Sequence, residues 1–334
     1  MKILITGGAG FLGDRLARIL LALDGLPLAG AAPRAVEQLL LVDRAEPRPD
    51  LAADPRVTPV VGDLAELLQG VLDGVDLVFH LAAVVSSEAE RDFDLGMLVN
   101  PATTMQLREA GRSAAAPPRL VFTSSLAVFG STADLPLPDV ITDSTLPTPQ
   151  SSYGIQKFIG EQLVADYARR GLVPARTVRL MTVTVRPGLP NAAASSFLSG
   201  IVREPLAGAP SNSPVAPDTL VAVTSPARTV DGLVRAATAS DAEWGPHTAV
   251  TLPALTVSVG GIVDALARVA GPEAAALVGW EPDPAIAAIV TSWPSRFEAA
   301  RARGLGLTAD PDFDTVIRDY LRDLGNAAPA AEGA

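Results

Sequence analysis

The sequence predicts an α/β protein built on a doubly wound parallel sheet, followed by a smaller C-terminal α/β lobe. Short apolar segments of strand length alternate with helical patterns through the first half of the chain. This alternation is typical of a parallel sheet covered by helices on both faces. The length of 334 residues, 48% of them hydrophobic, is sufficient for one large domain or two modest ones.

The first strand is predicted in "KILITGG", and a helix follows the glycine-rich turn through "DRLARILLAL". Further strands are predicted, in chain order, in "EQLLLVDR", "RVTPVVGDL", "DLVFHLAA", "RLVFTSSLAVFG" and "ARTVRLMTVTV". Helical patterns occupy "DFDLGMLVNPATTMQLREAGRSA" and "SYGIQKFIGEQLVADYARRG". These elements predict a first domain over residues 1–185.

After about residue 185, Pro, Ser and Ala become frequent and the alternation stops. A helix in "SPARTVDGLVRAATA" and a strand in "HTAVTLP" predict that residues 220–252 return to the first domain. Helices in "SVGGIVDALARVAG" and "PDFDTVIRDYLRDL" belong to a second lobe, predicted over residues 186–219 and 253–328. Residues 329–334 are predicted to be a frayed tail.

Composition excludes several classes of function. The chain has no cysteine, which rules out disulfides, thiolate zinc sites and cysteine nucleophiles, and with only two histidines we predict no metal site. A net charge of −11 disfavours nucleic acid and anionic membranes as partners. Because the sequence has no signal-peptide pattern and no apolar run of membrane-spanning length, we expect a cytoplasmic protein.

The stretch "TGGAGFLG" lies between the first strand and the first helix and contains Gly7, Gly10 and Gly13. Such glycines permit a tight turn and the close approach of a diphosphate, which the N-terminus of the helix then faces with unpaired N–H groups. The arrangement is typical of dinucleotide binding by a Rossmann-type sheet. Phe11 and Leu12 belong to the same predicted cofactor site.

In such folds an acidic residue about 20 residues beyond the glycines binds the adenosine ribose. Asp43 lies farther along, because the Gly/Pro/Ala-rich segment "DGLPLAGAAPR" is inserted before the second strand. Its carboxylate would accept hydrogen bonds from the ribose hydroxyls and repel a 2′-phosphate, which favours NAD. The neighbouring Arg44 could accept that phosphate, so NADP remains an alternative. Asp63 and Leu64, after the third strand, are predicted to contact adenine.

Tyr153 and Lys157 are related as i and i+4 on a predicted helix and therefore share one face. A tyrosine with a pKa near 10 is a poor base at neutral pH, but a nearby ammonium stabilises its phenolate. The pair can then remove a hydroxyl proton while hydride leaves the carbon. Ser124 and Ser125 end the fifth strand, at the edge where parallel sheets place ligands, and can orient the substrate oxygen.

Together, "TGGAGFLG", "HLAA", "TSSLAVFG" and "YGIQK" resemble the extended short-chain dehydrogenase/reductase superfamily, which includes NAD-dependent epimerases and dehydratases. The resemblance implies Ser125, Tyr153 and Lys157 as the catalytic triad, a nicotinamide cofactor, and a homodimer formed through the helices around 95–112 and 152–170. The further cofactor-lining residues that it implies are His80, Leu81, Ala82, Ala83 and Asn100. A structural role for His80 and a helix-surface role for Asn100 remain alternatives.

Two later segments, "TVTVRPGLPNAAASSFLSGIVREPLAG" and "VAGPEAAALVGWEPDPAIAAIVTSWPSRFEAARARGLGL", resemble the D-erythronate dehydrogenase branch of this superfamily. That resemblance implies NAD-dependent oxidation of the 2-hydroxyl of a four-carbon sugar acid. The residues expected to contact substrate are Ser86, Ser87, Asn191, Ser195, Ser196 and, as an anion site, Arg228. Ordinary loop hydrogen bonding is the alternative for the serines.

The chain departs from the pattern of this branch at several positions. Met181 replaces a proline beside the cofactor, Leu189 a lysine and Ala227 an arginine, and the segment "NPATT" replaces Asn-x-x-Gly-Thr. Two of these changes remove positive charge that could bind a carboxylate. We therefore hypothesise a substrate range shifted towards less charged alcohols or ketones.

Two other functions are possible for this motif set. A nucleotide-sugar 4-epimerase or dehydratase uses the same triad, but the segment "LVAVTSPARTV" lacks the Arg-Asp-Tyr-x-His-Val pattern common in such enzymes. A non-catalytic NAD-binding sensor would need the glycines and Asp43 but has no use for a complete triad. A hydrolase has no support, because the sequence has no G-x-S-x-G elbow.

Overall fold

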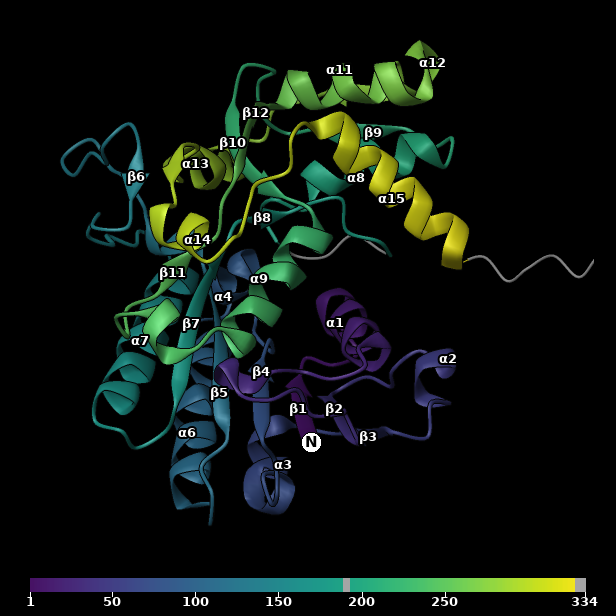
Figure 1. Cartoon of the computed structure of the whole chain (residues 1–334). Coiled ribbons are helices and arrows are strands. Elements are labelled where there is room, and N and C mark those ends of the chain that lie inside the picture. The colour runs from purple at the N-terminus through teal and green to yellow at the C-terminus, as the bar shows by residue number, and fades with distance from the viewer. Residues whose placement is uncertain (189–192, 328–334) are drawn as a thin grey trace, which may run out of the picture.

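The structure, a computed structural model, describes residues 1–188 and 193–327 (Figure 1). Its central sheet has seven strands in the order β11-β7-β5-β4-β1-β2-β3, and all neighbours run parallel. The strands are β1 (Lys2–Thr6), β2 (Gln38–Asp43), β3 (Val57–Val61), β4 (Leu77–His80), β5 (Arg119–Ser125), β7 (Ala175–Leu180) and β11 (Val250–Thr251). The strand order reverses between β1 and β4, which is where doubly wound sheets bind ligands.

Helices cover both faces of the central sheet because its strands are apolar on both sides. On one face, Ile3 and Leu39 form a core with Leu16 of α1 (Phe11–Ala22) and Leu233 of α9 (Pro226–Thr238). The opposite face forms a second core with α3 (Leu64–Val71), α6 (Thr103–Ser113) and α7 (Ser152–Arg169). The predicted doubly wound α/β fold is confirmed.

The second lobe lies above the carboxyl edge of this sheet (Figure 1). It is built on a sheet of β8 (Thr182–Val183), β10 (Leu220–Thr224) and β12 (Leu255–Ser258), in the order β12-β10-β8. Its main helices are α8 (Phe197–Leu206), α11 (Val259–Ala270), α13 (Pro284–Ser292) and α15 (Phe313–Ala327). Ile201, Ile262 and Ile317 lie in its separate core.

The chain passes from one sheet to the other at Met181. The sequence predicts one strand over 175–185, but the structure divides it into β7 and β8, which belong to different sheets. The Met181 side chain is buried with Leu126 and Ala222 at this junction. Similarly, β10 joins the second sheet, whereas α9 and β11, which follow it in the chain, lie on the first.

Shorter elements complete the described chain. They are η1 (Leu28–Gly30), α2 (Pro49–Ala52), α4 (Ser86–Arg91), α5 (Phe93–Met97), the π-helical η2 (Leu98–Ala102), η3 (Leu126–Val128), β6 (Ile141–Thr142), β9 (Ser211–Ser213), α10 (Asp241–Trp244), α12 (Pro272–Ala275), β13 (Val278–Trp280), β14 (Phe297–Glu298) and α14 (Ala300–Gly304). Within residues 1–188 and 193–327, no helix combines the length and the hydropathy that a membrane span requires.

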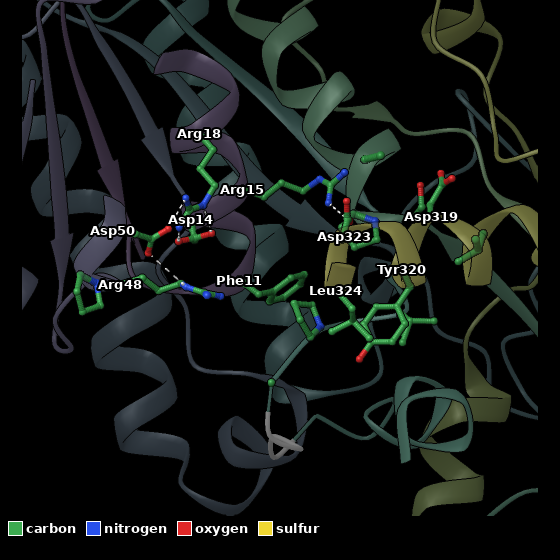
Figure 2. Close-up of a pocket in the computed structure, with 18 residues that line it drawn as sticks. Phe11, Asp14, Arg15, Arg18, Arg48, Asp50, Asp319, Tyr320, Asp323 and Leu324 are labelled. Atoms are coloured by element: carbon green, nitrogen blue, oxygen red, sulfur yellow. Dashed lines mark hydrogen bonds and ion pairs between the residues drawn. The ribbon is translucent and has the colours of Figure 1, made fainter. Parts of the chain in front are cut away.

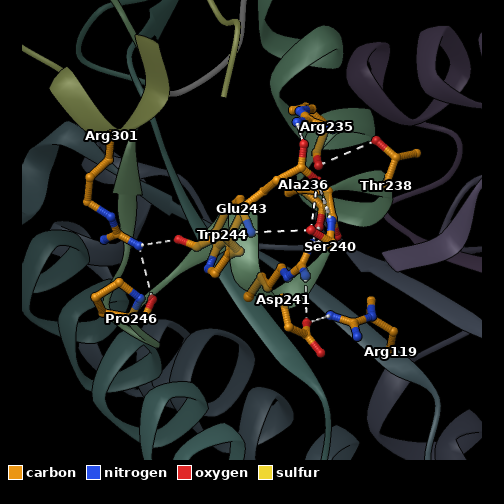
Figure 3. Close-up of polar contacts among 12 residues, drawn as sticks. Arg119, Arg235, Ala236, Thr238, Ser240, Asp241, Glu243, Trp244, Pro246 and Arg301 are labelled. Atoms are coloured by element: carbon orange, nitrogen blue, oxygen red, sulfur yellow. Dashed lines mark hydrogen bonds and ion pairs between the residues drawn. The ribbon is translucent and has the colours of Figure 1, made fainter. Parts of the chain in front are cut away.

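A polar cluster around the buried Arg176, which we call the Arg176 corner, fixes the segment after α9 to the central sheet (Figure 3). Arg176 of β7 donates to two backbone carbonyls at the end of α9, each at 2.7 Å, and to Asp241 at 2.7 Å. Its guanidinium also stacks on Trp244 at 5.0 Å. Arg119 of β5 pairs with the same Asp241, and Arg301 donates to the carbonyl of Trp244. Each of these arginines therefore has oxygen acceptors within the protein.

Candidate active site

The glycine-rich turn after β1 forms a cradle that excludes side chains. Gly7 has a φ of +72°, and a Cβ there would lie 2.9 Å from the backbone nitrogen of Ala82. A Cβ at Gly13 would lie 2.2 Å from the carbonyl oxygen of Gly7. Gly10 caps α1 without a side-chain hydrogen bond, so no capping side chain occupies the first N–H groups of the helix. This geometry fits the diphosphate of a dinucleotide.

Two carboxylates lie at the ends of β2 and β3, beside this cradle. Asp43 accepts hydrogen bonds from the backbone nitrogens of Ala9 at 3.0 Å and Ala45 at 3.2 Å, which fixes its carboxylate next to the turn. Asp63 caps α3 by accepting from a backbone nitrogen at 2.9 Å, and Leu64 begins that helix. Both acids are thus positioned at the edge where adenosine is predicted to bind.

His80 and Asn100 have structural partners. His80 is buried between the hydroxyls of Thr6, 2.7 Å from Nδ1, and Thr104, 3.1 Å from Nε2. Burial lowers the pKa of His80 to about 3, so the imidazole stays neutral. The Asn100 side chain accepts from the backbone after β4 at 3.0 Å and donates to Gln156 of α7 at 2.7 Å. Both residues hold the wall of the site in place rather than facing its centre.

The predicted triad converges at the carboxyl end of β5. Ser125 ends that strand, and its Oγ accepts from the backbone nitrogen of Ala127 at 3.2 Å. Tyr153 and Lys157 lie on α7, with the Lys157 ammonium 5.8 Å from the centre of the tyrosine ring. Lys157 donates to the carbonyl of Thr123 at 3.0 Å. The structure therefore brings the serine, the phenol and the ammonium to one place.

Burial sets the electrostatics of this site. It raises the pKa of Tyr153 to about 12, although a hydrogen bond with Ser125 and the positive charge of Arg186 act in the opposite direction. Burial also lowers the pKa of Lys157 to about 8. A proton can therefore leave this pair close to neutral pH, since the two groups share one desolvated site.

A cavity of about 200 Å³ opens in front of the triad. The predicted residues that line it are Phe11, Leu12, Leu81, Ala83, Ser86, Ser125, Tyr153, Lys157, Met181 and Ser195. Ser87 and Ser196 are absent from this lining, as far as the described residues show, and Asn191 lies outside them. The Ser86 hydroxyl accepts from the backbone nitrogen of Ala194 at 3.2 Å and so connects the two halves of the cavity wall.

Two further lining residues, Arg186 and Trp293, escaped prediction from the sequence. Arg186 is the first cation after β8, and its place beyond a strand end is a signal that could have identified it. Trp293 comes from the loop after α13, far along the chain, and no local pattern connects it to the triad.

The structure does not bring Arg228 to the triad, in contrast to the sequence prediction. Arg228 lies in the first turn of α9 and is 3.5 Å from Asp231 on the same helix. It lines a separate cavity with Thr224 and Leu252. The reason is the passage between sheets, because α9 packs on the central sheet and carries Arg228 away from the second lobe.

A larger cavity of about 820 Å³ lies between α1 and α15 (Figure 2). Arg15 and Asp323 point toward one another across it and form an ion pair, while Arg18 pairs with Asp14 and Asp50. Ala227 lines this cavity and not the one in front of the triad. The arginine that the D-erythronate dehydrogenase branch usually has at this position would therefore not face the triad.

Comparison with known proteins identifies relatives along the whole chain. The model of the NAD dependent epimerase/dehydratase family matches residues 3–216. A D-erythronate dehydrogenase from Cupriavidus necator is 48% identical over 330 residues, covering 98% of this chain and 100% of the relative. A second D-erythronate dehydrogenase, from Haemophilus influenzae, is 39% identical and covers 96% and 99%.

Among solved structures, the nucleoside-diphosphate-sugar epimerase from Agrobacterium tumefaciens superposes with a TM-score of 0.89. It is 38% identical, and the match covers 98% of this chain and 95% of that one. Both lobes and the seam between them therefore have a counterpart in a solved structure.

Proposed function

The chain belongs to the NAD dependent epimerase/dehydratase family and is a nicotinamide-dependent oxidoreductase, and from this premise we propose that it oxidises the 2-hydroxyl of a four-carbon sugar acid such as D-erythronate. The observation that carries the proposal is the convergence of Ser125, Tyr153 and Lys157 on a cavity beside the glycine cradle. The two D-erythronate dehydrogenases among its relatives support the choice of substrate.

In the proposed reaction, Ser125 holds the substrate hydroxyl and the Tyr153 phenolate removes its proton. Lys157 stabilises that phenolate, which otherwise forms only at high pH because the phenol is buried. A bound nicotinamide supplies the acceptor for the hydride. Met181, Leu126 and Trp293 shield the reacting carbon from water on the side of the second lobe.

We propose NAD as the preferred form of the cofactor. The Asp43 carboxylate is fixed beside the cradle by two backbone hydrogen bonds, so a 2′-phosphate would meet a negative charge there. The ratio of kcat/KM for NAD+ and NADP+ tests this. A ratio well above one is expected, and Asp43→Ala should lower it; equal use of both cofactors would contradict the proposal.

Function is tested by NADH formation when the purified protein is offered D-erythronate, a panel of neutral secondary alcohols and a UDP-sugar. Oxidation of D-erythronate with the highest kcat/KM is expected. Faster oxidation of neutral alcohols would favour the shifted substrate range hypothesised from Leu189 and Ala227. Conversion of the UDP-sugar without net NADH formation would instead identify a nucleotide-sugar epimerase.

We also propose a homodimer. Large apolar side chains are exposed on α5, η2, α6 and α7, the elements of the predicted interface: Phe93, Leu98, Met105, Ile155 and Ile159. Such a group is costly to leave in water and is typical of a subunit contact. Light scattering should give twice the monomer mass, and Ile155→Asp should reduce it to that of the monomer. A monomeric wild-type protein would contradict the proposal.

A two-lobe division fits the same mechanism: we propose a cofactor domain of residues 1–185 and 220–252 and a substrate lobe of 186–219 and 253–328. Separate cores on the two sheets support it. The Arg176 corner supports the return of the segment after α9 to the first domain. Strands β8 and β10 pair within the smaller sheet, so we move residues 182–185 and 220–224 from the predicted first domain to the substrate lobe.

A further inference from the structure

Arg186 is a cation at the catalytic cavity that the motifs of the sequence do not identify. It lines the same cavity as Ser125 and Tyr153. Its backbone is anchored on the second lobe, because its nitrogen donates to the Ser199 hydroxyl at 3.0 Å and its carbonyl accepts from Arg203 at 3.0 Å. These contacts fix the main chain and leave the side chain to face the cavity.

The Arg186 guanidinium has no hydrogen bond or ion pair to any residue that the structure describes. Its nearest aromatic neighbour is the Phe11 ring, 5.8 Å away. Burial lowers the pKa of Arg186, and the charge of Arg203 acts in the same direction. A desolvated cation beside a second cation is unfavourable until an anion arrives.

The buried arginines Arg179 and Arg108 differ from the partly buried Arg186 in this respect. Arg179 forms a two-point ion pair with Glu161, at 2.8 and 2.7 Å. Arg108 has no carboxylate partner among the described residues, but it stacks on Tyr167 at 4.3 Å, is fully buried and does not line the triad cavity. Within the part of the chain that the structure describes, Arg186 thus combines a guanidinium that has no polar partner with access to the reacting groups.

We propose that Arg186 binds the carboxylate of the substrate and thereby selects 2-hydroxy acids. This inference rests on the proposed function, which it deepens by naming the group that recognises the acid. In a 2-hydroxy acid the carboxylate is attached to the carbon that bears the reacting hydroxyl. When Ser125 and Tyr153 hold that hydroxyl, the carboxylate can only be neutralised by a cation close to them.

Arg186 and Tyr153 line the same cavity, and the arginine charge lowers the pKa of the phenol. The guanidinium therefore lies close enough to the reacting hydroxyl to meet the neighbouring carboxylate. A guanidinium can bind a carboxylate through two parallel hydrogen bonds, which fixes orientation as well as charge. The Ser86 and Ser195 hydroxyls line the same cavity and suit the remaining hydroxyls of a sugar acid. Acid recognition by Arg186 therefore does not depend on position 227, which lines the other cavity.

The diphosphate of the cofactor is a second oxyanion within this region, because Phe11 begins α1 directly after the turn that would cradle it. The substrate carboxylate and the cofactor diphosphate predict different effects when Arg186 is substituted. A carboxylate anchor affects only the acid substrate, whereas a diphosphate anchor affects the cofactor whatever the substrate. The test must therefore measure both.

The experiment compares wild type, Arg186→Met and Arg186→Lys in the full chain, with D-erythronate and its neutral amide as substrates. For Arg186→Met, kcat/KM with D-erythronate should fall by about 30-fold or more, on the scale of losing a charge-assisted hydrogen bond. Activity with the amide and the Kd for NADH should change less than about 3-fold. Arg186→Lys should be intermediate, because it keeps the charge but loses the fork.

Arg169→Met is the matched control, since Arg169 is exposed on α7 and pairs with Asp166. An equal loss with acid and amide, or a weaker Kd for NADH in Arg186→Met, would assign Arg186 to the diphosphate and overturn the proposal. Unchanged kinetics with D-erythronate would overturn it as well, while leaving the proposed function intact.

Failure of the proposed function gives a different result. Calorimetric binding of D-erythronate to the enzyme–NADH complex does not require turnover. If wild type binds the acid but does not oxidise it, and Arg186→Met abolishes binding, the carboxylate site stands and the proposed reaction fails. If wild type does not bind the acid at all, the carboxylate site is refuted.

Discussion

Two arginine side chains of the same protein, the buried Arg176 and the partly buried Arg186, have opposite surroundings. In the Arg176 corner, the central guanidinium meets two carbonyls and one carboxylate and stacks on Trp244. At the catalytic cavity, the Arg186 guanidinium has only an aromatic ring beside it among the described residues. The Arg176 guanidinium finds its acceptors within the fold, whereas we propose that the Arg186 guanidinium finds its acceptor in a ligand. Lack of pairing together with access to the catalytic cavity therefore distinguishes Arg186, since Arg108 also lacks a carboxylate partner within the described chain but does not line that cavity.

The largest expected effect concerns the catalytic side of this comparison. Tyr153→Phe removes the phenol and keeps the ring, so kcat should fall by about 10³-fold or more, at the upper end of general acid–base contributions. Steady-state NADH formation measures it, and the Kd for NADH, which should change little, shows that the cofactor site is intact. A variant with wild-type turnover would rule out the triad and favour a protein that only senses the cofactor.

The next largest effect tests the structural side. Arg176→Met leaves two carbonyls without their donor, while Asp241 keeps Arg119, so the free energy of unfolding should fall by about 2–4 kcal/mol. Urea denaturation measures this loss. Arg169→Met breaks a solvent-exposed pair and should cost less than about 1 kcal/mol. Equal losses in the two variants would refute the structural role of the corner.

The dependence of kcat/KM on pH tests the role of Lys157, the second cation of the catalytic site. The Tyr153–Lys157 pair loses its first proton near pH 8, because burial lowers the pKa of Lys157 to about 8. Since oxidation needs the deprotonated pair, kcat/KM should rise with pH through about 8. Lys157→Met removes the ammonium that stabilises the phenolate, so the rise should move to higher pH and activity at pH 8 should be low. A profile that stays unchanged in this variant would contradict the pairing.

The smallest expected effect belongs to Arg228, which the sequence assigned to substrate binding and the structure places in another cavity with Asp231 as partner. Arg228→Met should change kcat/KM with D-erythronate by less than about 3-fold, whereas Arg186→Met should change it strongly. Parallel kinetics of the two variants measure the contrast. A large effect at Arg228 would mean that the two cavities join during catalysis.

The sequence predicts those parts of the molecule that depend on local pattern. The glycine turn, the strand ending at Ser125 and the i, i+4 pair on α7 lie where expected, and the family inferred from these motifs is confirmed. The residues that the second lobe contributes to the catalytic cavity depend instead on where the chain leaves the central sheet. One residue, Met181, separates β7 from β8, and no composition signal marks that break. The place of Arg186 and the displacement of Arg228 both follow from it.

The edge strand β11 has a consequence for synthesis on the ribosome. It pairs with β7, although it is made about 70 residues later. At translation rates of about 5–20 residues per second, β7 waits roughly 4 to 14 seconds for its neighbour. During that interval the nascent sheet has an open edge, and Arg176 lacks the carbonyls that α9 later supplies. The period of greatest risk of aggregation therefore precedes the completion of the chain, and slowing elongation over residues 180–251 would prolong it.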